Sequence, residues 1–352
     1  MKLTAAFLAS LYVVLLGAAQ ANIAIPIVTV GNPGNPNDSG NGNLYGGVNY
    51  TYAIGKYEVT LTQYTEFLNA VAKTDTFSLY NSNMATNPNV AGISQSGVSG
   101  SFGYSVIGDG NRPITYVSWF DAARFTNWLH NGQPVGLQVA GTTEQGAYAL
   151  NGATTGANFT KGSSAQWWIP TVSEWYKAAY YQPKASGGPT TGYWLYPMQS
   201  NSTPYSDEPP GATPDNTRVG NFCKDDGIAN GYDDGYALSG STSFPAGTAL
   251  TAVGAYTSSD TYYGPFDHGG NVWEWNDAIS GSSRGLRGGS WSNFADFQRS
   301  LLNGTSNPSG ESETFGFRVA TVPEPTVAVS LIFTGCVLLA RRKRAHFSML
   351  RK

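Results

Sequence analysis

Few side chains in this chain of 352 residues could carry nucleophilic, redox or soft-metal chemistry. The histidines are His130, His268 and His346, and their spacing is not that of a zinc or iron site. Cys223 and His268 could form a thiol–imidazole pair, but nothing in their spacing favours one. The sequence also lacks a phosphate-binding loop, a Gly-x-Ser-x-Gly elbow and a His-Glu-x-x-His motif. No standard catalytic centre is therefore predicted.

Carboxylates are abundant once the two chain ends are set apart. Removal of Lys2, and of the six basic residues and Glu324 that follow Val322, leaves 13 basic and 22 acidic residues, a net charge of −9. A body of this charge is unsuited to nucleic acid, because phosphate contacts need Lys and Arg. Acidic, oxygen-rich loops instead suit hard cations such as Ca²⁺. Cys336 lies in the apolar tail, so Cys223 is the only thiol of the body and no internal disulfide is expected there.

Both chain ends have the composition of export signals. Residues 1–21 combine Lys2, an apolar run and Ala19-Gln20-Ala21, which is typical of a cleaved secretory signal peptide. At the other end, Pro323-Glu324-Pro325 precedes an apolar run, residues 326–340, and then Arg341-Arg342-Lys343-Arg344. A helix of this length spans about 22 Å, short of the ~30 Å hydrocarbon core, with its basic cluster on the cytoplasmic side. We expect an exported envelope or extracellular protein with a C-terminal membrane anchor.

The order of Pro-Glu-Pro, apolar helix and basic cluster over residues 322–345 resembles the PEP-CTERM sorting signal of Gram-negative envelope proteins. The resemblance implies processing by an exosortase, which would cleave near Pro323-Glu324-Pro325. Signal peptidase would process the other end. The alternative is a plain membrane anchor that is not cleaved.

Three helices are predicted in the body, each from a capping pattern followed by an apolar face. They cover about residues 61–72 after Thr60, 119–130 after Ser118, and the run from Thr171 to Tyr181. Residues 22–45 are rich in Gly, Asn and Pro and predict a loop or an edge strand. The rest of the body is predicted to form short aromatic strands between Gly-rich turns, in agreement with the 43 Gly and 19 Pro of the sequence. The fold class expected is α+β, loop-rich and low in regular secondary structure.

Six motifs occur in a fixed order along residues 46–320. They are Tyr57-Glu58-Val59-Thr60; Arg112-Pro113-Ile114 with Val117-Ser118-Trp119-Phe120-Asp121-Ala122; Ile169-Pro170-Thr171 with Glu174-Trp175; Gly270-Asn271-Val272-Trp273-Glu274-Trp275; Arg287-Gly288-Gly289-Ser290-Trp291; and Gly316-Phe317-Arg318-Val319-Ala320. Together they resemble the formylglycine-generating enzyme, or sulfatase-modifying factor, domain. That family has a variant of the C-type-lectin-like fold, so the same fold is implied here.

The resemblance implies two calcium sites built from oxygen donors. In the first, Asn221 and Asp234 would contribute side chains, and Phe222 and Tyr236 their carbonyls. The second would comprise Asp267, Gly270, Val272 and Glu274, with Gly270 and Val272 contributing carbonyls. The alternative is that Asp233-Asp234-Gly235 forms a solvated turn and Glu274 is a satisfied acid.

The sequence departs from this family at its catalytic centre. Family enzymes hold copper between two cysteines after the Gly-Gly-Ser motif, whereas here an ungapped count places Asn293 and Gln298 at those positions. Amides cannot replace thiolates, because a soft metal needs soft ligands. Copper-dependent oxidation is therefore not expected. A cleft lined by Trp273, Gly288, Gly289, Ser290 and Trp291 would remain for a peptide or a glycan, unless these residues serve only packing.

Three functions remain open. The first is a calcium-stabilised, non-catalytic binding or envelope-assembly module, favoured by the missing cysteines and the export signals. The second is an oxidoreductase of the sulfatase-modifying type acting on protein cysteine, which rests on the family resemblance alone. The third is lectin-like sugar binding, suggested by Trp275-Asn276-Asp277, a tripeptide that also occurs at lectin calcium sites.

Overall fold

The computed structural model describes residues 23–211, 213–244 and 247–323. The predicted signal peptide, residues 1–21, and residues 324–345 of the predicted sorting signal lie outside this part of the chain. So does the apolar run 326–340. Among the described residues, no helix combines the length and the apolar character needed to cross a membrane.

The three predicted helices form at the predicted places. Their bounds are α1 (Leu61–Val71), α3 (Trp119–His130) and α4 (Val172–Tyr180), and a short helix α2 (Asn83–Thr86) lies between the first two. Each of α1, α3 and α4 begins with a capping box, in which the side chains of the N-cap and N3 residues bond to each other's backbone N–H. Local sequence chemistry alone therefore sets where each of these helices begins.

Most of the described strands are short, and they are divided among several small sheets. The first sheet has the order β1 (Ile27–Val30), β2 (Tyr52–Gly55), β14 (Ala320–Thr321) and β5 (Trp167–Trp168). The second has the order β12 (Gly304–Ser306), β11 (Ser283–Arg287), β10 (Trp273–Ser280) and β13 (Phe315–Gly316). The remaining strands pair two by two: β3 (Ile93–Ser96) with β4 (Gly103–Val106), β6 (Tyr205–Ser206) with β7 (Val219–Gly220), and β8 (Cys223–Asp225) with β9 (Asp234–Tyr236).

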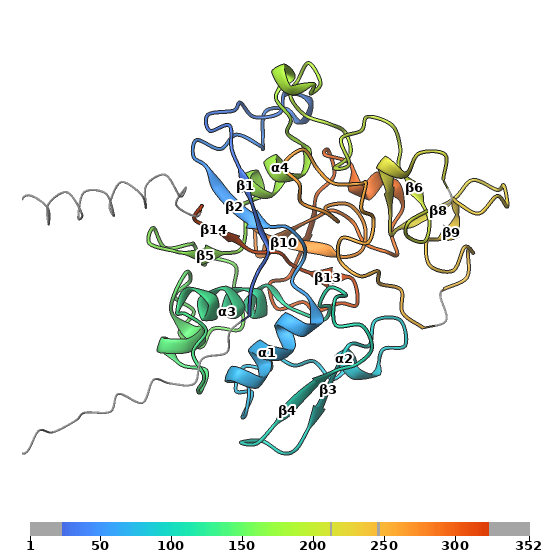
Figure 1. The fold of residues 1–352 in the computed structure, drawn as a ribbon. Coiled ribbons are helices and arrows are strands. Elements are labelled where there is room, and N and C mark those ends of the chain that lie inside the picture. Colours follow the sequence, from blue (N-terminus) through green and yellow to red (C-terminus); the bar gives the residue numbers. More distant parts are fainter. Residues whose placement is uncertain (1–22, 212, 245–246, 324–352) are drawn as a thin grey trace, which may run out of the picture.

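The predicted α+β, loop-rich fold is thus confirmed. Figure 1 shows α1 and α3 together on one side of the central strands β10, β13 and β14, with α4 on the other side. The β6, β8 and β9 strands lie apart from the helices, at the right of the view. The predicted edge strand near the N-terminus is β1, which pairs antiparallel with β2.

Aromatic side chains join helices α1 and α3 to the strands. Phe67 of α1 lies 5.3 Å from Phe125 of α3, centroid to centroid, and Phe125 lies 5.4 Å from Phe317 in edge-to-face contact. All three are fully buried. Edge-to-face pairs at such distances add to the stabilisation that comes from burial. This cluster fixes the Gly316-Phe317-Arg318 motif against the helices and so positions Arg318 for the interior contacts described below.

Candidate ligand-binding site

The residues predicted to line a cleft lie where the β10–β11 hairpin ends. Trp273 begins β10, and β11 ends at Arg287, immediately before the two glycines Gly288 and Gly289. These have φ angles of +100° and +72°, a region that favours glycine. A Cβ on Gly288 would also lie 2.9 Å from the carbonyl oxygen of His268. The glycines therefore let the chain turn tightly beneath Ser290.

Asn293, which the ungapped count predicts at the position of the family's first cysteine, is the centre of a small hydrogen-bond cluster. Its Oδ1 accepts from Trp273 Nε1 at 2.7 Å, from Ser290 Oγ at 2.7 Å and from Ser290 N at 3.1 Å. The amide oxygen thus joins Trp273 of β10 to Ser290 of the Gly-Gly-Ser turn. Its partners are neutral donors, so Asn293 is held in place as a structural acceptor.

Gln298, which the same count predicts at the position of the second cysteine, has a different environment. It ends the short 3₁₀-helix Ala295–Gln298 and is 1% exposed. Its Oε1 and Nε2 have no hydrogen-bond partner within the described residues, although its backbone oxygen accepts from Tyr180 Oη at 2.9 Å. An unsatisfied buried amide group costs about 1–3 kcal/mol. Gln298 therefore has a buried amide group without a hydrogen-bond partner among the described residues.

Cys223 lies next to Asn293, which the sequence did not reveal. Its backbone N donates to the Asn293 carbonyl at 2.8 Å, and Cys223 forms a parallel bridge with Phe294. The residue is 9% exposed, and burial, followed by the charge of Asp225, raises the pKa of its thiol. A thiol that is protonated at neutral pH is a poor nucleophile and a poor metal ligand.

The residues predicted to line the cleft are themselves buried. Trp273 is 9% exposed, Trp291 1% and Ser290 0%, and Gly288 and Gly289 are buried too. Trp291 packs with Val90, Ala249, Leu250 and Val272 in a hydrophobic cluster, as expected if its role is packing. Three phenylalanine side chains near them are exposed to solvent instead: Phe294 is 65% exposed, Phe244 58% and Phe297 38%.

The first predicted calcium set is brought together by the β8–β9 pair, in which Tyr236 lies opposite Cys223. The Phe222 carbonyl accepts from Ser206 Oγ at 2.6 Å and from Ala237 N at 3.3 Å, and the Tyr236 carbonyl accepts from Gly240 N at 2.9 Å and from Ser239 N at 3.1 Å. Both lone pairs of each carbonyl are thus in use. Calcium binding here would require these carbonyls to exchange protein donors for the ion.

The side chains of the first set keep more acceptor capacity. Asp234 Oδ2 accepts one bond, from Gly231 N at 2.9 Å. Asn221 Nδ2 donates to Asn271 Oδ1 at 3.0 Å, and the Asn221 carbonyl accepts from Asn271 N at 2.7 Å. Asn271 lies within the loop of the second set, so the structure places the two predicted calcium loops in direct contact. A Cβ on Gly270 would lie only 2.3 Å from the Asn221 oxygen.

Glu274, of the second set, is engaged in a fully buried ion pair. Its Oε2 accepts from Arg318 Nε at 2.5 Å and from Trp175 Nε1 at 2.7 Å, and its Oε1 accepts from Arg318 Nη2 at 2.6 Å. Both charged side chains are 0% exposed. These three bonds use three of about four acceptor positions of a carboxylate, which leaves one on Oε1.

Asp267 of the same set lies close to a second buried acid, Glu58. Burial raises the pKa of Asp267 to about 6, while the Gly254 N–H at 2.5 Å and Arg318 act in the opposite direction. Burial, and next the charge of Asp267, raises the pKa of Glu58 well above its usual value. Glu58 Oε1 accepts weakly from Asn271 Nδ2 at 3.3 Å, and Oε2 has no partner among the described residues.

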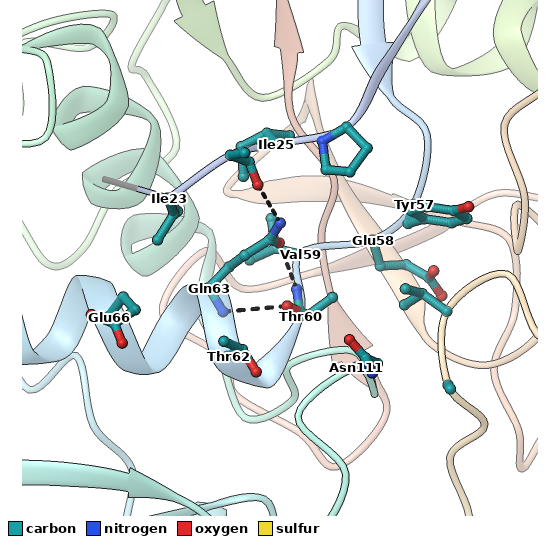
Figure 2. Close-up of a pocket in the computed structure, with 14 residues that line it drawn as sticks. Ile23, Ile25, Tyr57, Glu58, Val59, Thr60, Thr62, Gln63, Glu66 and Asn111 are labelled. Atoms are coloured by element: carbon teal, nitrogen blue, oxygen red, sulfur yellow. Dashed lines mark hydrogen bonds between the residues drawn. The ribbon is translucent and has the colours of Figure 1, made fainter. Parts of the chain in front are cut away.

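Glu58 also lines a pocket of about 640 Å³, shown in Figure 2. One wall is the N-terminal segment Ile23, Ala24, Ile25 and Pro26. Gln63 of α1 connects the walls, because its Nε2 donates to the Ala24 carbonyl at 3.0 Å while its Oε1 accepts from Thr60 N at 3.0 Å. The first described residues are therefore part of the folded body.

Trp275-Asn276-Asp277, the tripeptide shared with lectins, lies inside the protein. Trp275 and Asn276 are 0% and 1% exposed, and Asp277 Oδ1 pairs with Arg284 Nη1 at 2.7 Å. The Trp275 indole donates to the Val117 carbonyl at 2.9 Å. These contacts give the tripeptide a structural role.

Sequence reasoning missed the partners of the predicted acids. Arg318, Trp175 and Glu58 all surround the second calcium set, although they lie 44, 99 and 216 positions from Glu274 along the chain. All three belong to the ordered motifs quoted above. The signal was therefore present in the sequence, but nothing in it showed that these motifs meet.

Comparisons with known proteins give a family match. Residues 48–322 match the family described as sulfatase-modifying factor enzyme 1-like domain. Solved structures similar to this chain include CarF (17% identity, TM-score 0.46, covering 86% of this chain and 99% of that one) and Treponema denticola variable protein 1 (18%, 0.43, 84% and 95%). PvdO from Pseudomonas aeruginosa is also similar (15%, 0.38, 87% and 98%). No curated protein matches the chain.

Proposed function

Because this chain belongs to the sulfatase-modifying factor family, we propose that it is an exported, non-catalytic binding or assembly module of the cell envelope. Calcium stabilises its fold, and its ligand is a peptide or a glycan held over the surface around Asn293. Signal peptidase and an exosortase process its two ends.

The observation that carries this proposal is the chemistry at the family's cysteine positions. Asn293 offers an amide oxygen that already accepts from Trp273 and Ser290, and Gln298 offers a buried amide. Neither group can supply a thiolate to copper. Cys223 is adjacent but has a raised pKa, so it does not take their place. The chain therefore combines the family's fold with a centre that lacks thiolate ligands for copper.

An exposed aromatic surface beside this centre supports a binding role. Phe294 and Phe297 follow Asn293 in the sequence and are 65% and 38% exposed, and the Phe297 ring lies 6.0 Å from Trp273 in edge-to-face contact. Phe244 packs 5.6 Å from Trp291 and is 58% exposed. Exposed aromatic side chains are enriched at binding surfaces, and Phe244 and Phe297 each contact a buried tryptophan of the predicted cleft. We name the surface of Phe244, Phe294 and Phe297 the aromatic surface.

The calcium part of the proposal is supported by the donor chemistry of the second set. Asp267 and Glu274 supply carboxylates, and Glu274 Oε1 keeps one acceptor position. A net charge of −9 over the body also favours cation uptake. The ion would join loops in a body that contains no disulfide.

Metal analysis of residues 22–322, with thermal unfolding before and after chelation, tests the proposal. We expect bound calcium, no copper, and a large fall in melting temperature on chelation. Oxygen consumption with a cysteine-containing peptide and copper should stay at the level of the blank. Stoichiometric copper or peptide oxidation would overturn the non-catalytic assignment, and unfolding that ignores chelation would overturn the calcium assignment.

The binding role is tested by a peptide and glycan array probed with Phe294→Ser and a matched control. Leu137→Ser is the control, because Leu137 is 62% exposed and lies outside the aromatic surface. We expect bound array members to be lost with Phe294→Ser and kept with Leu137→Ser. Equal binding by both variants would show that the aromatic surface is not the binding site.

A further inference from the structure

A second polar pocket, of about 330 Å³, opens at the start of helix α3 and is separate from the aromatic surface. It is lined by the first turns of α3 and by parts of three loops, residues 76–78, 154–155 and 309–311. Its side chains include Phe77, Asp121, Arg124, Thr155 and Glu311. We call it the Asp121 pocket. None of the residues placed in the candidate cleft contributes to it.

Arg124 supplies the pocket with hydrogen-bond donors that have no partner. Its Nε and Nη2 bind Glu144 at 2.7 and 3.1 Å, and the guanidinium stacks 4.2 Å from the centroid of Phe77. Its Nη1 makes no hydrogen bond to any described residue, although the side chain is 0% exposed. A buried, charged donor without an acceptor is costly. An acceptor atom from a bound ligand would satisfy the Nη1 group.

Two carboxyl groups supply acceptors in the same pocket. Asp121 caps α3 through Oδ2, which accepts from Ser118 N at 2.8 Å and Ser118 Oγ at 2.6 Å, so the cap does not use Oδ1. Glu311 accepts from Asn81 through Oε2, which leaves Oε1 outside that contact. The Ser118 hydroxyl is already used by the cap, because it donates to Asp121 Oδ2 and accepts from Asp121 N. The Thr155 hydroxyl adds a group that both donates and accepts.

The presence of one cationic donor and two carboxyl acceptors in the same pocket limits the chemistry of the ligand. An anion would be repelled by Asp121 and Glu311, and a simple cation has no acceptor for Arg124 Nη1. A hydroxyl group donates and accepts at once, so adjacent hydroxyls on one ring satisfy both Arg124 and the two carboxyl groups. Such pockets have volumes from about 300 Å³ upward.

We propose that the Asp121 pocket binds one neutral, polyhydroxylated sugar ring. Arg124 Nη1 donates to one hydroxyl oxygen of the ring, and Asp121 and Glu311 accept from neighbouring hydroxyls. The pocket lies outside the aromatic surface, so the outcome is independent of whether that surface binds a peptide or a glycan.

Saturation-transfer NMR tests the proposal on the full-length protein in a detergent without sugar groups. The probes are glucose, galactose, mannose and N-acetylglucosamine, each in the millimolar range. Thr155→Trp fills the mouth of the pocket, and Thr160→Trp is its control, because both threonines are exposed and only Thr155 lines the pocket. Glu311→Gln removes one acceptor charge, and Glu313→Gln is its control on the same loop.

We expect transfer to at least one of the four sugars with the wild type and with both controls. It should fall at least tenfold in Thr155→Trp and severalfold in Glu311→Gln, with melting temperatures unchanged. No transfer to any of the four sugars in the wild type would overturn the proposal, and so would equal transfer in Thr155→Trp. A Thr155→Trp variant that melts early leaves Glu311→Gln as the deciding comparison.

Discussion

Replacement of Glu274 by Gln tests the buried ion pair with Arg318 directly. Glu274→Gln keeps the shape of the side chain but removes the charge and turns an amide N–H₂ toward the donors of Arg318 or Trp175, which lie 2.5–2.7 Å from the carboxylate oxygens. Breaking a buried pair by removing one partner costs about 3–5 kcal/mol. Glu58 and Asp267 also interact with Arg318 and partly compensate its charge, so we expect about 3 kcal/mol. That is about a 100-fold change in the folding equilibrium constant.

Urea unfolding of residues 22–322, followed by tryptophan fluorescence, measures this loss. The control is Asp296→Asn, because Asp296 and Arg299 form an exposed pair at 3.7 Å with side chains 72% and 37% exposed. Such a surface pair contributes about 0–1 kcal/mol, so the control should unfold close to the wild type. The comparison requires unchanged m-values. A loss below about 1 kcal/mol in Glu274→Gln would refute the view that Arg318 depends on this carboxylate.

Three further predictions concern pH, the Asn293 cluster and a loop contact. Burial, and next the charge of Glu311, raises the pKa of Asp121 to about 7 from an unfolded value of 3.8, so the folded state holds this proton more tightly. The resulting stability is present below pH 3.8 and is lost as pH rises toward 7. Asp121→Asn should therefore reduce the decline in the free energy of unfolding between pH 4 and 7, measured by urea unfolding. An unchanged dependence of this free energy on pH would contradict the assignment. Asn293→Ala should cost about 1–3 kcal/mol in the same assay, because Trp273 Nε1 and Ser290 lose their acceptor, whereas a loss within error would mean that water replaces Oδ1 without cost. Gly270→Ala should lower the melting temperature far more than Gly264→Ala. Both glycines have positive φ, which costs about 1–2 kcal/mol for a non-glycine residue, but only the Gly270 Cβ would contact backbone, at 2.3 Å from Asn221 O. Equal losses would show that the loop moves to accommodate the added Cβ.

The helices could be predicted from the sequence because their causes are local. Thr60, Ser118 and Thr171 each cap a helix through a residue three positions later, and the apolar face follows at helical spacing. The family fold could also be inferred, because six motifs in a fixed order are readable without coordinates. The strands were foreseen only as a class, because many are short and some, such as β14 with β2 and β5, pair with partners far away in the chain.

The candidate site was predicted only in part. The sequence named Asn293 and Gln298 as the residues at the cysteine positions, but not that Asn293 Oδ1 binds Trp273 and Ser290 while the Gln298 amide finds no partner among the described residues. It named Glu274 as an acid of a calcium loop, but not that Arg318 and Trp175 reach it. The predicted calcium ions and the export signals stay predictions.

By itself, the sequence determined which chemical groups exist in this protein: a body with one thiol, a large excess of carboxylates and no copper-binding pair after the Gly-Gly-Ser motif. Composition and local capping need no long-range information, so these conclusions do not depend on how the chain folds. Only the tertiary structure decided which groups meet. It placed Cys223 against Asn293, Arg318 against Glu274, and the unpaired edge of Arg124 in a pocket with Asp121 and Glu311. The reason is that burial and hydrogen bonding depend on distances between residues far apart in the chain, which packing of the whole body sets.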